Sequence, residues 1–109
     1  MYRANRTNTG LVATMAVLAA TAAEAQATQV VIDNFAFSPR EIIVTPGTRV
    51  TWVNHDDVPH TVTSSVKPRA FDSKAMDTDD TFSFVFTTPG TYEYFCAVHP
   101  HMTGKIIVK

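Results

Sequence analysis

The sequence contains a single cysteine, Cys96, in 109 residues. A disulfide within the chain is therefore excluded, although small exported domains often depend on disulfides for stability. If the protein is exported, the lone thiol needs another explanation, such as a role in binding a metal.

The chain also lacks a basic stripe. It has nine Lys and Arg against ten Asp and Glu, a formal net charge of −1. Its one charge cluster is acidic and comprises Asp77, Asp79 and Asp80. Proteins that bind nucleic acid neutralise phosphates with clustered Lys and Arg, so we expect no nucleic-acid partner.

No hydrophobic run is long enough to cross a membrane comfortably. The uncharged, alanine-rich stretch at residues 11–23 falls short of the roughly 20 apolar residues that a spanning helix needs. Two arginines precede it and small residues with Ala-x-Ala spacing follow it: Arg3, Arg6, Ala23, Ala25 and Ala27. This pattern is typical of a secretory signal peptide. We expect residues 1–25 to be cleaved off, with cleavage after Ala27 or an uncleaved anchor as the alternatives.

The exported part would be one small domain, residues 28–109, because the chain is too short for a second. Cleavage after Ala25 would leave seven Lys and Arg against nine Asp and Glu, a formal charge of −2. We expect no membrane insertion of this part.

Helical periodicity is almost absent from that domain. Runs of β-branched and aromatic residues alternate with turn signals instead, at residues 29–33, 41–45, 49–54, 60–64, 81–86, 91–96 and 104–109. We interpret residues 34–40 as a connection. Residues 66–80 are expected to form a long loop that packs over a sheet edge and can include a helical turn. Seven to eight short strands predict an all-β sandwich.

Alternation along the strands predicts which side chains face the core. The inward positions are Val50, Trp52, Asn54, Phe82, Phe84, Phe86, Tyr92, Tyr94, Cys96, Ile106 and Val108. Phe35 and Phe37 alternate in the 34–40 connection, and we assign them core or edge packing. The Thr-Pro-Gly-Thr sequence occurs at both 45–48 and 88–91, which predicts two similar corners between the sheets.

Soft metal ligands are concentrated near the C-terminus. Cys96, His99 and Met102 follow one another at three-residue steps, and His60, directly after Pro59, offers a second imidazole at the start of a strand. This donor set suits both oxidation states of copper better than it suits calcium, magnesium or structural zinc. We expect one type 1 copper ion, Cu(I)/Cu(II), with two imidazoles and a thiolate near one plane and a weak axial thioether.

Each of these side chains has a simpler explanation when it is taken alone. Cys96 could be a small buried hydrophobe, either histidine a hydrogen-bonded surface residue, and Met102 a residue that fills space in the core. The fixed spacing of three ligand types, together with a histidine after proline and an unpaired exported thiol, favours the copper site. His55 and His101 are interpreted as solvent-facing loop residues.

The sequence resembles the cupredoxins, or blue copper proteins, and within them the amicyanin type with its short ligand loop. The resemblance rests on Cys96-x-x-His99-Pro100-x-Met102, on His60 after Pro59, on Thr-Trp-Val-Asn at 51–54 and on Pro-Gly-Thr-Tyr-x-Tyr at 89–94, and it covers about residues 30–108. It implies a Greek-key β-sandwich with a copper ion held by His60, Cys96, His99 and Met102.

The resemblance further implies a small soluble periplasmic monomer that carries electrons between larger redox proteins, such as a dehydrogenase donor and a c-type cytochrome acceptor. Thr61 departs from the pattern, because many cupredoxins carry Asn there to tie the two ligand-bearing segments together. Thr can still hydrogen-bond but reaches less far than Asn, so this position bears on the rigidity and the potential of the site.

Two functions follow from this site. In the first, electrons pass through the exposed edge of His99, which an apolar surface of Pro59, Val98 and Pro100 surrounds. In the second, the protein carries or stores periplasmic copper, with His55, His101 and Met76 as extra contacts, although Met-rich and His-rich tracts are absent. An enzyme is not expected, because the chain has neither a second ligand cluster nor the length for another domain.

Overall fold

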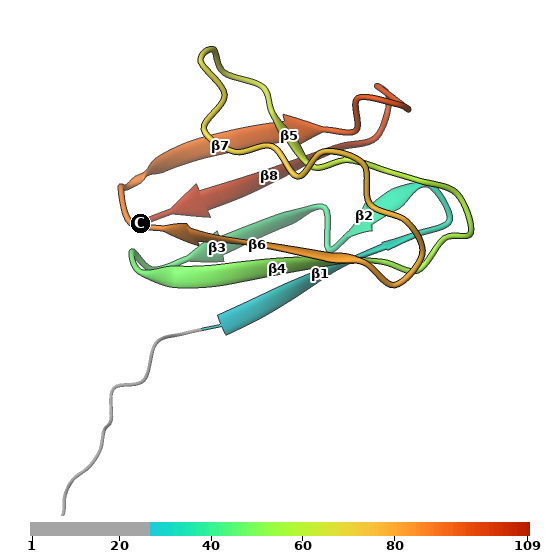
Figure 1. Ribbon diagram of the computed structural model, residues 1–109. Helices are drawn as coiled ribbons and strands as arrows, with labels where there is room; N and C mark the ends of the chain where they lie inside the picture. The colour runs from blue at the N-terminus through green and yellow to red at the C-terminus, as the bar shows by residue number, and fades with distance from the viewer. Residues whose placement is uncertain (1–26) are drawn as a thin grey trace, which may run out of the picture.

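Eight β-strands and no helix make up residues 27–109, which are the residues that the computed structural model describes (Figure 1). The strands are β1 (Ala27–Asp33), β2 (Ala36–Ser38), β3 (Glu41–Val44), β4 (Thr48–Asn54), β5 (Thr63–Ser64), β6 (Thr81–Phe86), β7 (Gly90–Phe95) and β8 (Thr103–Val108). The signal peptide expected at residues 1–25 lies outside the described residues. Within them, no helix is long and apolar enough to cross a membrane.

The strands form two four-stranded sheets that pack face to face (Figure 1). One sheet has the order β2-β1-β4-β6 and the other β3-β8-β7-β5, and each contains one parallel pair, β1 with β4 and β3 with β8. From β2 to β7 every connection passes from one sheet to the other, whereas β1–β2 and β7–β8 join neighbours in one sheet. The expected all-β, Greek-key sandwich is confirmed.

Both Thr-Pro-Gly-Thr corners change sheets, as the repeated sequence predicts. The first leads from β3 to β4 and the second from β6 to β7. At the first corner Gly47 has φ +94°, a conformation that suits glycine. The Thr48 hydroxyl donates to Thr45 O at 2.7 Å and closes the turn.

Trp52 lies at the centre of the core between the sheets and is fully buried. Its ring stacks on Phe71 with centroids 5.9 Å apart and meets Tyr94 edge-on at 5.4 Å. The inward faces predicted for β4, β7 and β8 are confirmed: Val50, Asn54, Tyr94, Cys96, Ile106 and Val108 are buried, and Tyr92 is partly buried against the core. On β6, Phe86 is buried, and Phe82 and Phe84 are partly buried against the core.

Three sequence expectations differ from the structure. The 34–40 connection contains a strand, β2, which pairs with β1 and buries Phe37, while Phe35 remains 50% exposed. The expected strand at 60–64 is paired with β7 only at Thr63–Ser64. The 66–80 loop contains no helical turn. It runs antiparallel beside residues 60–63 instead, where bridges join His60 to Met76 and Thr63 to Asp72.

Candidate metal centre

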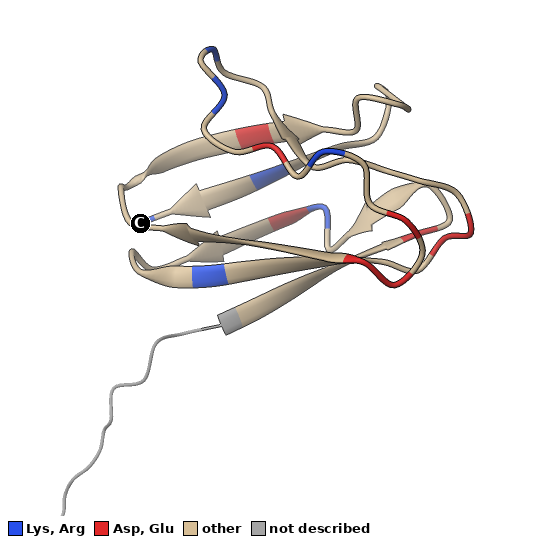
Figure 2. Cartoon of the chain, in the orientation of Figure 1, with Lys and Arg blue, Asp and Glu red and all other residues tan. Residues whose placement is uncertain are grey.

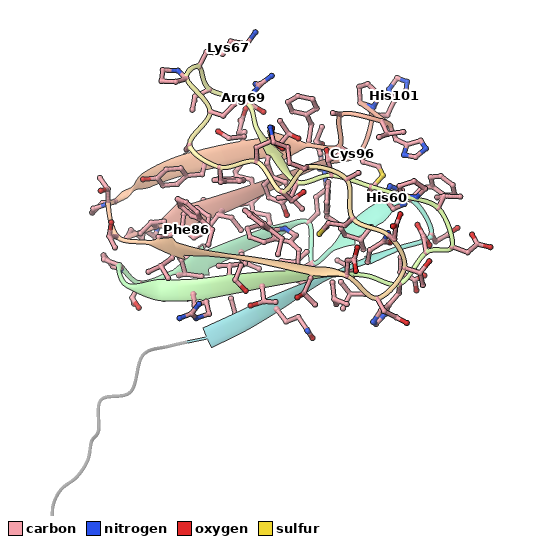
Figure 3. The ribbon with its side chains drawn as sticks, viewed as in Figure 1. His60, Lys67, Arg69, Phe86, Cys96 and His101 are labelled. Carbon is pink, nitrogen blue, oxygen red and sulfur yellow. The ribbon has the colours of Figure 1, made fainter. Side chains whose placement is uncertain are left out.

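Three of the four expected ligands meet at one end of the sandwich, and Figure 3 shows the Cys96 sulfur beside His60. His60 Nδ1 lies 3.2 Å from His99 Nδ1, and Cys96 Sγ lies 3.7 Å from each of these nitrogens. A point equidistant from the three atoms is about 2 Å from each, a normal length for metal–nitrogen and metal–sulfur bonds. The donors therefore fit a single metal ion.

His60 is fixed on both its backbone and its ring. Its N–H and carbonyl both pair with Met76, at 3.2 and 2.9 Å. The ring is fully buried, and Nε2 donates to Asp56 Oδ2 at 2.8 Å. Because Nε2 binds the carboxylate, Nδ1 is left with its lone pair toward Cys96 and His99, as a metal ligand requires.

The Asp56 carboxylate has two further donors. The backbone N–H groups of Asn34 and Phe35 donate to its oxygens at 2.7 and 2.9 Å. Desolvation raises the pKa of Asp56, but these two backbone bonds and the bond from His60 outweigh it and lower the pKa below the ordinary value. The group is therefore a carboxylate that links the β1–β2 turn to a candidate ligand.

Asn54, predicted only as an inward-facing residue, orders the loop that leads to His60. Its side-chain amide donates to Val58 O at 2.9 Å and to Met76 O at 3.0 Å, while its Oδ1 accepts from the Asp56 N–H at 2.9 Å. All its polar atoms are thereby satisfied in a buried position.

Cys96 follows β7 and is fully buried. The Thr61 N–H donates to its sulfur at 3.3 Å, which ties the segment that carries His60 to Cys96. The loop from Cys96 to Met102 is closed by two backbone hydrogen bonds, Cys96 N to Met102 O at 3.0 Å and Met102 N to His99 O at 2.9 Å. Met102 is buried within this loop, and its role as an axial ligand stays a prediction.

Thr61 does connect the two ligand-bearing segments. Its hydroxyl accepts a hydrogen bond from the Ala97 N–H at 2.7 Å and bonds to the Thr63 hydroxyl at 2.8 Å. The shorter side chain of Thr therefore still makes this bond, as the sequence allowed. The hydroxyl needs less reach here because Thr61 itself lies against Cys96.

Phe35 and Asp56 belong to the site, although the sequence predicts only a packing role for Phe35 and no role for Asp56. The Phe35 ring meets both imidazoles edge-on, with centroids 5.3 Å from His60 and 5.0 Å from His99. An acidic residue four positions before a candidate histidine was the available signal for Asp56. Phe35 had no comparable signal.

His55 and His101 are exposed, as expected, and neither belongs to the metal cluster. Figure 3 shows His101 at the surface of the ligand loop. Among residues 27–109, His60, Cys96 and His99 form the one group of three or more His, Cys, Asp or Glu side chains that could hold a metal.

The fold and this donor set define a type 1 copper protein, and comparison with known proteins agrees. The chain belongs to the cupredoxin family, because the Cupredoxin-like domain matches residues 8–108. One type 1 copper ion is the cofactor that the family and these four candidate residues share.

Within the family, the similar proteins include amicyanins. The chain is 34% identical to amicyanin-alpha of Methylorubrum extorquens over 104 residues. The aligned region covers 93% of this chain and 87% of that protein. A solved Cu(I) structure of an amicyanin variant superposes with a TM-score of 0.72 at 31% identity, over 76% of this chain and 82% of the other. A purple cupredoxin from Nitrosopumilus maritimus superposes with a TM-score of 0.69 at 32% identity, over 75% of this chain and 99% of the other.

Proposed function

We propose that this protein carries single electrons between redox proteins of the periplasm, using one copper ion held by His60, Cys96, His99 and Met102. The observation that carries the proposal is the triangle of His60 Nδ1, His99 Nδ1 and Cys96 Sγ, whose sides of 3.2 to 3.7 Å fit one metal ion. Copper, when bound, supplies the one-electron Cu(I)/Cu(II) couple. No substrate bond is made or broken, so we do not expect enzymatic activity.

The protein contributes rigidity and access. Hydrogen bonds to the Asp56 carboxylate and bonds with Thr61 and Met76 hold the segments that bear His60 and Cys96. Held ligands move little when the charge on the metal changes, which keeps the barrier to electron transfer low. His99 is the half-buried member of the triangle, so its ring edge is the path from the site to the surface.

The surface next to His99 suits another protein. Exposed apolar residues lie on the segments that flank it: Phe35, Pro59, Val98 and Pro100. Exposed aspartates lie at the end of β1 and in the loops before and after the first ligand. We call Asp33, Asp57, Asp77, Asp79 and Asp80 the acidic rim. Figure 2 shows these acidic segments gathered at the end of the sandwich that holds the site. A donor dehydrogenase or an acceptor c-type cytochrome with a basic rim would fit this end.

Export is supported by the N-terminal sequence pattern and by the fold. Strand β1 begins at Ala27, which pairs with Arg49 of β4. Cleavage after Ala25 would leave β1 whole, whereas cleavage after Ala27 would remove its first residue. We therefore propose a monomeric periplasmic protein that begins after Ala25, and N-terminal sequencing of the exported protein would check the position.

The alternative, a periplasmic carrier or store of copper, has less support. A carrier must release its ion to an acceptor, but two of the candidate ligands are fully buried and fixed by hydrogen bonds. His55 and His101 are exposed outside the cluster. Copper transfer to an acceptor that is faster than electron exchange with a cytochrome would favour the carrier.

Reconstitution with Cu(II) tests the proposal. We expect an intense visible thiolate-to-copper band in the wild type and in His101→Ala, a control outside the cluster. Cys96→Ala should abolish the band. A colourless wild type, or a band that survives Cys96→Ala, would refute the proposed site.

A further inference from the structure

The β1–β2 turn breaks a local backbone rule next to the metal centre. Asp33 pairs with Ala36, and the two residues between them, Asn34 and Phe35, have φ of +54° and +61°. Two-residue hairpin turns with positive φ at both positions favour Asn followed by Gly. A bulky aromatic residue with positive φ is a genuine outlier.

The strain has a cost that glycine would avoid. The left-handed conformation disfavours a residue with a β-carbon by an amount that corresponds to roughly 5- to 30-fold in the folded-to-unfolded ratio. Backbone strain of this kind persists where the surrounding structure requires it, often at functional sites. The side chain at position 35 is therefore the feature to explain.

The Phe35 ring does not fill the core, since it is 50% exposed. It stands edge-on to both candidate histidine ligands, with interplanar angles of 88° to His60 and 89° to His99. The residue that strains the turn is thus the residue that touches both imidazoles.

The turn itself is tied to the site. Asp56 accepts the backbone N–H groups of Asn34 and Phe35 and, on the same carboxylate, Nε2 of His60. The adjoining His55 N–H donates to Ile32 O at 2.8 Å. Two hydrogen bonds to the same oxygen, Asp56 Oδ2, therefore connect the Phe35 backbone to the His60 ring.

The two histidines depend on Phe35 to different degrees. His60 has the Asp56 carboxylate on its outer nitrogen. Within the described part of the chain, His99 Nε2 makes no hydrogen bond. The rings that the His99 imidazole meets there are those of Phe35 and His60. Removal of the Phe35 ring should therefore free His99 more than His60.

We propose that Phe35 is a positioning residue, held in a strained turn so that its ring fixes the His99 imidazole against His60. This inference rests on the proposed function, because it assigns Phe35 to the same metal site. Edge-to-face aromatic pairs change an equilibrium by about twofold to tenfold each. The ring contact is thus strong enough to bias the orientation of a half-buried imidazole.

Four variants separate the ring from the turn. Phe35→Gly removes the ring and relaxes the backbone, Phe35→Ala removes the ring and keeps the strain, and Phe35→Tyr keeps an edge-on ring. Asn34→Gly is the matched control, because it changes the same turn without touching either histidine. Imidazole NMR relaxation of the metal-free proteins reports the order of each histidine ring, and transfer of copper to a chelator reports retention by the loaded proteins.

We expect Phe35→Gly and Phe35→Ala to increase the mobility of the His99 ring, with a smaller change at His60, and to speed copper release by about twofold to tenfold. Phe35→Tyr and Asn34→Gly should match the wild type. Phe35→Gly should also be more stable than Phe35→Ala, by roughly 5- to 30-fold in the folding equilibrium constant.

Unchanged His99 mobility in both ring-deleted variants would overturn the inference. Equal stability of Phe35→Gly and Phe35→Ala would overturn its strain argument. If the wild type showed no thiolate-to-copper band, the proposed function would fail, but the metal-free NMR comparison would still decide whether Phe35 positions His99.

Discussion

Replacing Thr61 by valine should weaken the link between the two ligand-bearing segments while keeping the shape of the side chain. The Thr61 hydroxyl accepts from the Ala97 N–H at 2.7 Å and bonds to Thr63 at 2.8 Å. Valine has nearly the same volume and no hydroxyl, so the change deletes these two bonds and creates no cavity. The Thr61 N–H can still donate to Cys96 Sγ.

The magnitude follows from what each partner loses. The Ala97 N–H has no other partner among the described residues, and an unsatisfied donor of this kind costs about 1–3 kcal/mol when water cannot reach it. The site is only part-buried, so we expect the lower end, about 1 kcal/mol. The Thr63 hydroxyl keeps its contact with Asp72 at 3.4 Å and should contribute less.

Urea unfolding of the metal-free protein measures this loss, and Thr63→Val is the matched control. Thr63→Val deletes the same bond between the two hydroxyls, together with the long contact of Thr63 with Asp72 at 3.4 Å, but leaves the bond to Ala97 intact. We expect Thr61→Val to lower the free energy of unfolding by about 1 kcal/mol more than Thr63→Val, and Thr61→Ser to restore most of the loss. Equal losses for the two valine variants would refute the argument that Thr61 ties the segments together.

Three other predictions concern charge and packing. Asp56→Asn should lower the free energy of unfolding by about 1–3 kcal/mol in urea, whereas Asp57→Asn, an exposed neighbour, should change it little. The folded-state pKa of Asp56 lies below 3.8, so its stabilisation is complete above pH 3.8 and is lost as the pH falls through the folded-state pKa. The difference in the free energy of unfolding between wild type and Asp56→Asn should therefore narrow at low pH, and a difference independent of pH would contradict this. Gly104→Ala should lower stability by about 1–3 kcal/mol in thermal unfolding, because the new β-carbon would overlap the Tyr94 ring, and an unchanged Tm would mean that the ring can move aside. Electron transfer to a basic cytochrome should slow as ionic strength rises, and neutralising the acidic rim should flatten that dependence in stopped-flow measurements.

Much of the fold was predictable because the strands alternate clearly. Trp52, Tyr94 and Ile106 were assigned to the core from period-2 patterns, and all three are buried. The strand predicted at 60–64 is too long, because its first residues pair with the 66–80 loop rather than with a sheet. Nothing in the loop sequence signals that pairing. It depends on Phe71 and Met76 packing in the core against strands that are distant in sequence.

The sequence predicts the donors of the candidate site but not their surroundings. Cys96, His99 and Met102 share one loop, so the spacing predicts that they lie near one another, and the structure brings His60 beside Cys96 and His99 across the fold. The role of Asp56 does not follow from the sequence, because it depends on the backbone N–H groups of Asn34 and Phe35, which lie in a turn without a sequence signal.

That turn also explains why β2 was not expected. A two-residue hairpin is recognised from Asn-Gly or a similar pair, and Phe35 in place of glycine removes the signal. Local rules fail most often where function opposes them. Here the residue that breaks the turn rule is Phe35, whose ring centroid lies 5.0 Å from that of His99, a candidate ligand. The side chain that removes the hairpin signal is therefore the one that meets both candidate imidazoles, as expected if position 35 serves the site rather than the fold.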